Sequence, residues 1–92
     1  MKQVPLDFDG DTYDHDRDHE RLFAQLGRVR RVMLDARWHT LHEVSALTGD
    51  PPASVSARIR DLRKQKFGGH IVDRQYLHDG LWQYRLFVPE VA

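Results

Sequence analysis

The sequence contains no cysteine at all. Disulfide bonds and metal sites built on thiolates are therefore excluded, and a cytoplasmic location fits. No apolar run approaches the length of about eighteen residues that a transmembrane helix needs, so we expect no contact with a membrane. The N-terminal stretch MKQVPLDFDGD lacks the apolar segment of a secretion signal.

The formal net charge of zero hides an uneven distribution of charge along the 92 residues. Residues 1–20 hold seven acids and two bases, a net charge of −5, and residues 21–92 hold twelve bases and seven acids, a net charge of +5. A chain of this length forms one domain with a modest core. An acidic segment joined to a basic body suggests an anionic partner.

We expect residues 1–17 to form an acidic arm that is extended or disordered. Within this arm Val4, Leu6 and Phe8 alternate with other residues, which would also fit a short strand or a docked segment. Two runs, 7–11 and 14–18, have the D-x-D-x-D start of a calcium loop, but neither has the glycine at position six or the glutamate at position twelve.

Two histidines, His15 within the arm and His19 just after it, lie four residues apart. They could share one face of a helix, but two histidines without a third ligand form a weak metal site. A solvated acidic helix start is the better interpretation. We therefore predict neither a metal nor a cofactor.

Apolar spacing predicts a first helix over Asp18–Arg37, capped by Asp16 or Asp18. Gly27 interrupts it, which close helix–helix packing would explain. The apolar stripe consists of Leu22, Leu26, Val29 and Met33. Four arginines crowd the C-terminal half, where they suit the negative end of the helix and could equally contact phosphate: Arg28, Arg30, Arg31 and Arg37.

A second, shorter helix is predicted over Leu41–Thr48. The sequence from Thr40 to Glu43 forms a capping box, in which Thr40 is the N-cap and Glu43 reaches back to it. Gly49 ends the helix, and a short extended link of Trp38 and His39 precedes it. The residues expected to point inward are Leu41, Val44 and Leu47.

The central stretch of the chain is DPPASVSARIRDLRKQKFGG, residues 50–69, which predicts a third helix. Asp50 is the expected N-cap, with Pro51 and Pro52 in the first turn, where the missing amide protons cost nothing. Gly68 and Gly69 can end the helix. The inward face is expected to carry Val55, Ile59, Leu62 and the alkyl stem of Lys66. The outward face carries Ala53, Ala57, Arg60 and Lys64, flanked by Ser54, Ser56, Asp61 and Arg63.

A β-hairpin follows, with strands over His70–Tyr76 and Leu81–Val88. We expect a three-residue loop, His78 to Gly80, with a left-handed glycine. This loop pairs Val72 with Leu86, Arg74 with Tyr84 and Tyr76 with Trp82, and so gathers the aromatic side chains on one face. A two-residue loop of Asp79 and Gly80 would shift the register by one residue. Pro89 ends the sheet.

Three stretches carry a resemblance to a known family: TGDPPASVSARIRDLRK, FGGHIVDR and GLWQYRL. They resemble winged helix-turn-helix DNA-binding domains, most of all small stand-alone proteins of actinobacterial phages and prophages. The resemblance covers about residues 18–88 and leaves 89–92 as a tail. It implies an α+β fold with three helices, a short strand between the first two and a C-terminal hairpin wing. A phage-encoded protein would act in the cytoplasm of the host cell.

The resemblance implies double-stranded DNA as the partner, with the helix at residues 50–67 in the major groove. Small, hydroxylated and basic residues suit that position, although an ordinary solvated helix would carry them too. The wing tip, residues 77–80, has no Arg or Lys, which departs from the basic wings common in this family. The expected DNA-binding residues are Ser54, Ser56, Ala57, Arg60, Arg63, Lys64, Thr40, His42, Arg74 and Arg85.

Two other classes of function are alternatives to DNA binding. A winged helix can instead serve as a protein-interaction or dimerisation module, with a homodimer or a second protein docking on the acidic arm. An enzyme is not expected, because the sequence has no recognisable nucleophile–base order, no Gly-rich phosphate loop and no complete metal-ligand set. A nuclease would need carboxylates fixed on rigid elements rather than on such an arm.

Overall fold

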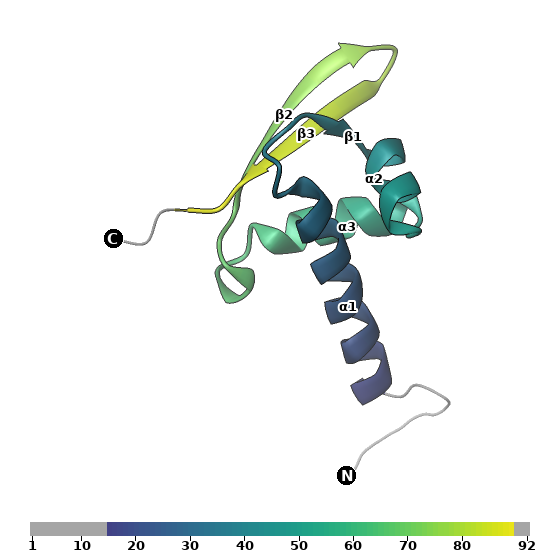
Figure 1. Cartoon of the computed structure of the whole chain (residues 1–92), viewed down its shortest axis with the longest axis vertical. Coiled ribbons are helices and arrows are strands. Elements are labelled where there is room, and N and C mark those ends of the chain that lie inside the picture. The colour runs from purple at the N-terminus through teal and green to yellow at the C-terminus, as the bar shows by residue number, and fades with distance from the viewer. Residues whose placement is uncertain (1–14, 90–92) are drawn as a thin grey trace.

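A computed structural model describes residues 15–89 of the chain. The elements are α1 (His15–Met33), β1 (His39–Thr40), α2 (Leu41–Thr48), α3 (Pro52–Leu62), the 3-10 helix η1 (Gln65–Phe67), β2 (Ile71–His78) and β3 (Leu81–Phe87) (Figure 1). This α+β order, three helices with a short strand after the first and a C-terminal hairpin, matches the winged-helix layout and confirms the predicted fold. The calcium-like run at 7–11 and most of the predicted acidic arm lie outside the described residues.

The first helix differs from its predicted bounds at both ends. Because α1 begins at His15, Asp16 and Asp18 lie within the helix and neither is its N-cap. It ends at Met33 rather than Arg37, and Ala36 then adopts a left-handed φ of 60°. A Cβ on Gly27 would meet nothing within 4 Å, so close helix packing does not explain that glycine.

The second helix has the bounds and the caps that the sequence predicts. The backbone amide of Glu43 donates to the Thr40 hydroxyl at 3.1 Å, and the Thr40 amide donates to the Glu43 carboxylate at 2.8 Å. Gly49 ends the helix with a φ of 80°. Val44 is buried and Leu41 packs against the core, but Leu47 is 66% exposed, so its predicted inward position is wrong.

The third helix is shorter than predicted. Its N-cap is Pro51, not Asp50. The helix ends at Leu62, whose carbonyl accepts a hydrogen bond from the backbone amide of His70 at 2.8 Å. Lys64 therefore lies beyond the helix. Lys66 belongs to η1 and is exposed, so its predicted place on the inward face is wrong.

The three strands form an antiparallel sheet in the order β1-β3-β2, and the predicted hairpin register is confirmed. The loop differs from the prediction. Asp79 and Gly80 both have positive φ, 50° and 76°, and His78 pairs with Leu81, which describes a two-residue loop. A bulge between Tyr76 and His78 absorbs the extra residue and so preserves the register.

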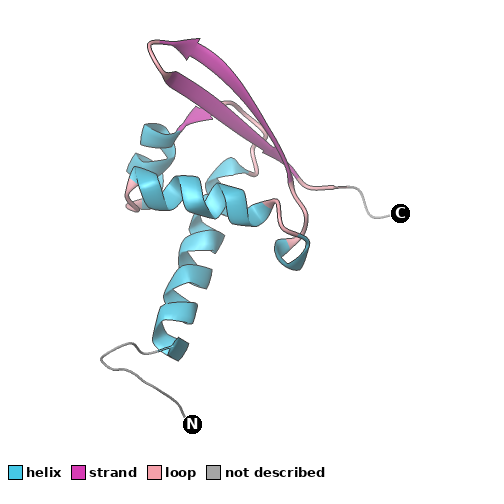
Figure 2. Ribbon diagram, turned by 180° about the vertical axis from the view of Figure 1, so that it is seen from behind, coloured by secondary structure: helices cyan, strands magenta, loops and turns pink. Residues whose placement is uncertain are grey.

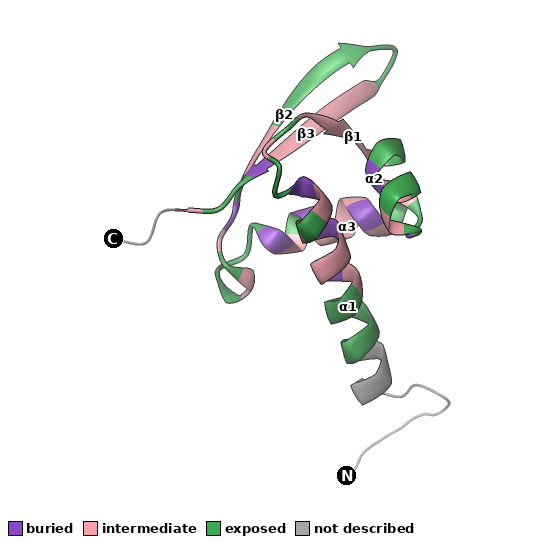
Figure 3. Cartoon of the chain, in the orientation of Figure 1, coloured by how far each residue is buried: buried purple, intermediate pink, exposed green. Residues whose placement is uncertain are grey.

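The core lies where α1, α2 and α3 meet the base of the hairpin, and the wing stands above α3 (Figures 2 and 3). Val55, Ile59 and Leu62 are buried as predicted, whereas Trp82, on the aromatic face of the hairpin, is only half-buried and lies outside the core. No described helix is long and apolar enough to cross a membrane. The buried apolar residues are Leu26, Val29, Met33, Val44, Val55, Ile59, Leu62 and Leu86.

Candidate nucleic-acid interface

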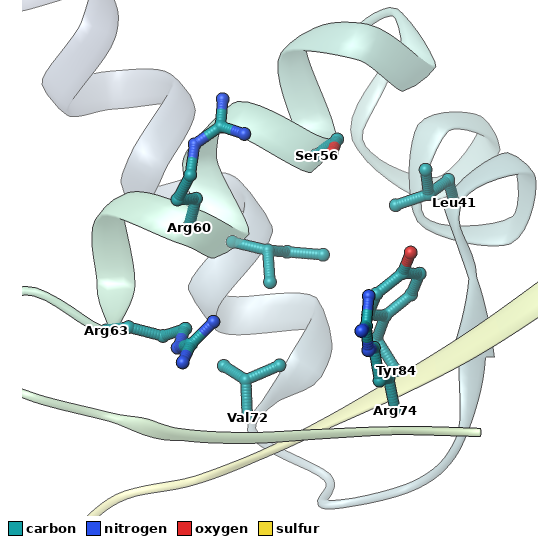
Figure 4. A pocket seen from close by; sticks show the side chains of 8 residues that line it. Leu41, Ser56, Arg60, Arg63, Val72, Arg74 and Tyr84 are labelled. Atoms are coloured by element: carbon teal, nitrogen blue, oxygen red, sulfur yellow. The ribbon is translucent and has the colours of Figure 1, made fainter.

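A hollow of about 390 Å³ lies between α3 and the wing (Figure 4). We call it the arginine hollow, because three of its eight lining residues are arginines: Arg60, Arg63 and Arg74. None of its lining residues is acidic. The hollow therefore offers several guanidinium groups to an anion without a carboxylate beside them.

Local structure explains how the arginines come to one hollow. Ser56 and Arg60 are four residues apart on α3 and so share a helix face. Arg63 follows as the C-cap of α3. Arg74 comes from β2, opposite Tyr84 of β3, so it faces the helix from the sheet side (Figure 4). Ile59, Val72 and Leu41 supply the apolar part of the lining.

The acids nearest to these arginines along the chain are engaged elsewhere. Asp61 forms ion pairs of 3.0 Å with Arg58 and with Lys64. Asp73 accepts a hydrogen bond from Arg85 at 3.2 Å. Because these carboxylates already have cationic partners, they do not neutralise the hollow.

The two predicted arginines of the wing point to opposite faces of the sheet. Arg74 lies over the ring of Trp82, with its guanidinium carbon 4.8 Å from the ring centre. Arg85 pairs with Asp73 and lies over Trp38 at 4.4 Å. Arg85 does not line the arginine hollow, so the geometry does not bring it together with Arg60 and Arg63.

The remaining predicted contact residues divide between the hollow and its surroundings. Ser56 lines the hollow, whereas Ser54 and Ala57 are half-buried on α3 and do not line it. Lys64 is exposed but paired with Asp61. The Thr40 hydroxyl is engaged in capping α2.

His42 lines a second hollow of about 250 Å³, which extends from the start of α2 and α3 to the wing tip. The two hollows share Leu41 and Tyr84, so together they form one concave strip along the wing. Trp82 lines the part of the strip near the tip. Its aromatic surface was not among the predicted contacts, although its alternation with Tyr84 in the strand was a signal in the sequence.

A polar network fixes α3 in place, and none of its contacts is predicted from the sequence. The Asp50 carboxylate accepts two hydrogen bonds from Arg28 and one from Gln25, both on α1. Arg58 of α3 donates to the Gln25 side-chain oxygen at 2.9 Å. Hydrogen bonding from Arg28 lowers the pKa of Asp50, an effect that desolvation partly opposes. No local pattern reveals these contacts, because the partners are 22 to 33 residues apart.

Among the described residues, no group of three or more His, Asp or Glu side chains is placed to bind a metal ion. His19 instead packs edge-to-face on Phe23, with the ring centres 4.6 Å apart.

Comparisons with family models, curated proteins and solved structures found no match for this chain. The winged-helix layout is thus assigned from the topology alone.

Proposed function

We propose that this protein binds double-stranded DNA, with α3 in the major groove and the wing beside it. The observation that carries the proposal is the arginine hollow: three arginines, from α3, its C-cap and β2, with no acid among its lining residues. Arginine pairs with phosphate and with the base edges of guanine, and Ser56 is small enough for close approach. In this role the chain is a small regulatory or accessory DNA-binding protein of the phage type that its sequence resembles.

The test is a titration against random duplex DNA at several salt concentrations. Binding that uses phosphate contacts weakens with salt, with a slope of about −0.9 in log K against log salt for each contact. The triple variant Arg60→Ala, Arg63→Ala and Arg74→Ala should lose affinity, and its salt slope should be less steep.

A second triple variant provides the matched control. Arg31, Arg37 and Arg85 do not line the hollow, and replacing them with Ala removes the same formal charge. This control variant should bind DNA more tightly than the variant in which Arg60, Arg63 and Arg74 are replaced. Equal losses in both variants would mean that net charge alone attracts DNA. No binding by the unaltered chain at low salt would favour the alternative, a winged helix that serves as a protein-interaction module.

A further inference from the structure

An apolar groove of about 220 Å³ runs between the first half of α1 and the turn at η1. We call it the α1–η1 groove. Leu22, Phe23 and Leu26 line it from α1, and Phe67 lines it from η1. Leu22 and Phe23 are 48% and 49% exposed, which is high for large apolar side chains, and they belong to the exposed stretch of α1 at residues 19–24, which is green in Figure 3.

The groove is cationic as well as apolar. Lys64 and Lys66 both line it, and the ammonium group of Lys66 lies 5.1 Å from the centre of the Phe67 ring. Phe67 in turn meets Phe23 edge-to-face at 5.8 Å. Asp61 is also in the lining and pairs with Lys64 at 3.0 Å, yet the Lys64 side chain stays 52% exposed. A ligand for this groove should therefore combine apolar side chains with negative charge.

We propose that the occupant is the chain's own segment at residues 4–9, VPLDFD. Val4, Leu6 and Phe8 would meet the apolar wall, and Asp7 and Asp9 would meet Lys64 and Lys66. The same alternation that suits a short strand places these two kinds of side chain on opposite sides of an extended segment. The segment thus complements the groove in both polarity and charge.

The length of the chain between the segment and α1 allows this contact within one molecule. Phe23 lies eight residues into α1, about 12 Å from His15 at the helical rise of 1.5 Å per residue. Residues 9–14 can span about 20 Å when extended. Phe8 therefore reaches Phe23 and Phe67 without strain. The arginine hollow, in contrast, has no described lining residue from α1.

The test places a nitroxide spin label on the arm of the full-length chain and records amide signals by NMR. The chain has no cysteine, so Gln3→Cys creates a single attachment site. Docking requires selective loss of amide intensity at residues 64–67 and 22–23, with little loss at Leu47 on α2 or Gly80 at the wing tip. Uniform broadening, or strongest broadening around Arg60 and Arg74, would overturn the proposal.

Two variants separate this contact from a nonspecific attraction. Leu6→Ser with Phe8→Ser leaves every charge and the folded body in place, and it should abolish the selective broadening. Phe23→Ser should also abolish the selective broadening. Leu47→Ser, at an exposed leucine outside the groove, should leave the broadening unchanged. If broadening survives both groove-directed variants, charge alone is responsible and the proposed groove is wrong.

A mixed sample identifies whose arm is bound. An isotope-labelled chain without a spin label is combined with an unlabelled chain that carries one. If the isotope-labelled chain shows no broadening in this mixture, the broadening seen when a chain carries its own spin label comes from docking within that chain. Broadening of residues 64–67 in the mixed sample would assign the groove to the arm of a second copy and overturn the proposal.

Discussion

Asp50 and Arg28 form a bidentate ion pair, with Nε to Oδ2 at 3.0 Å and Nη2 to Oδ1 at 2.8 Å. The pair joins the turn between α2 and α3 to the middle of α1. The same turn is closed from α2, because the Ser45 hydroxyl donates to the Asp50 carbonyl at 2.6 Å. The contact thus fixes the entry of α3, the element on which the proposed DNA contacts depend.

We predict that Asp50→Asn destabilises the protein by about 1–3 kcal/mol, because a buried acceptor of charged hydrogen bonds loses its charge. Asp79→Asn is the matched control, since its side chain is 95% exposed and Asn tolerates the positive φ found there. Urea unfolding of both variants measures the difference. Equal stabilities would mean that the Arg28–Asp50 pair contributes nothing measurable.

The same pair predicts how stability depends on pH. Hydrogen bonding from Arg28 lowers the pKa of Asp50 in the folded protein below its value in the unfolded chain, about 3.9. The stability contributed by Asp50 is therefore fully present above that unfolded value and is lost as the pH falls through the folded pKa. Acid titrations of unfolding should show a shallower loss of stability in Asp50→Asn than in the unaltered chain. If both chains lose stability equally as the pH falls, this linkage is contradicted.

Ile59 tests the assignment of the buried face of α3. It is 5% exposed, so Ile59→Ala should cost about 2–5 kcal/mol from lost transfer energy and the cavity left behind. Leu47→Ala removes an aliphatic side chain that is 66% exposed and should change stability by about 0.5 kcal/mol or less. Denaturant unfolding compares the two, and a loss at Ile59 as small as that at Leu47 would mean that the helix phase is wrong.

The parts of the fold that depend on neighbouring residues could be predicted from the sequence. Thr40 and Glu43 are three residues apart, so their capping box is visible in the sequence and appears as expected. The hairpin register followed from gathering the aromatic residues on one face. The shape of the loop could not be predicted in this way, because a two-residue turn with a bulge gives the same strand pairing as a three-residue turn.

The parts that failed depend on partners far away in the chain. Asp50 has the residue type of an N-cap, but its carboxylate is engaged by Arg28, 22 residues earlier. Lys66 continues the helical spacing of Ile59 and Leu62, which predicts a longer third helix. The helix instead ends at Leu62, whose carbonyl accepts hydrogen bonds from both the backbone amide and the ring Nδ1 of His70. In the candidate site, the spacing of Ser56 and Arg60 was predictable. The opposite faces of Arg74 and Arg85 follow from the predicted register, because Arg74 pairs with Tyr84, the residue before Arg85 in β3. Which of the two faces lies against α3 depends on how the helices pack on the sheet, and only the structure shows that Arg74 is the one that lines the hollow.

The two wing arginines give a matched test of the proposed interface. Arg74→Ala and Arg85→Ala each remove one positive charge from the sheet, but only Arg74 lines the arginine hollow. We predict that Arg74→Ala weakens DNA binding and reduces the salt slope by about 0.9, the value for one phosphate contact, while Arg85→Ala leaves both nearly unchanged. Stronger loss in Arg85→Ala would place the DNA on the other face of the wing.

Deleting residues 1–14 tests whether the acidic arm competes with DNA. The cut removes Asp7, Asp9, Asp11 and Asp14 together with Lys2, a net charge of −3, and leaves α1 intact because the helix begins at His15. An arm near Lys64 and Lys66 lowers the positive potential beside Arg60 and Arg63, so we predict that the shortened chain binds duplex DNA more tightly at low salt. Exposed charges are screened over about 10 Å at 0.1 M salt, so the gain should shrink as salt rises.

A charge-preserving control distinguishes this competition from a general change in net charge. Leu6→Ser with Phe8→Ser keeps all the acids but removes the side chains proposed to hold the arm in the α1–η1 groove. If the docked arm is what competes, this variant should gain affinity at low salt as the deletion does. If only the deletion gains affinity, the acids act without docking, because their charge repels the DNA from any position near the body. Equal affinity of all three chains at both salt concentrations would show that the arm does not compete for the DNA-binding surface.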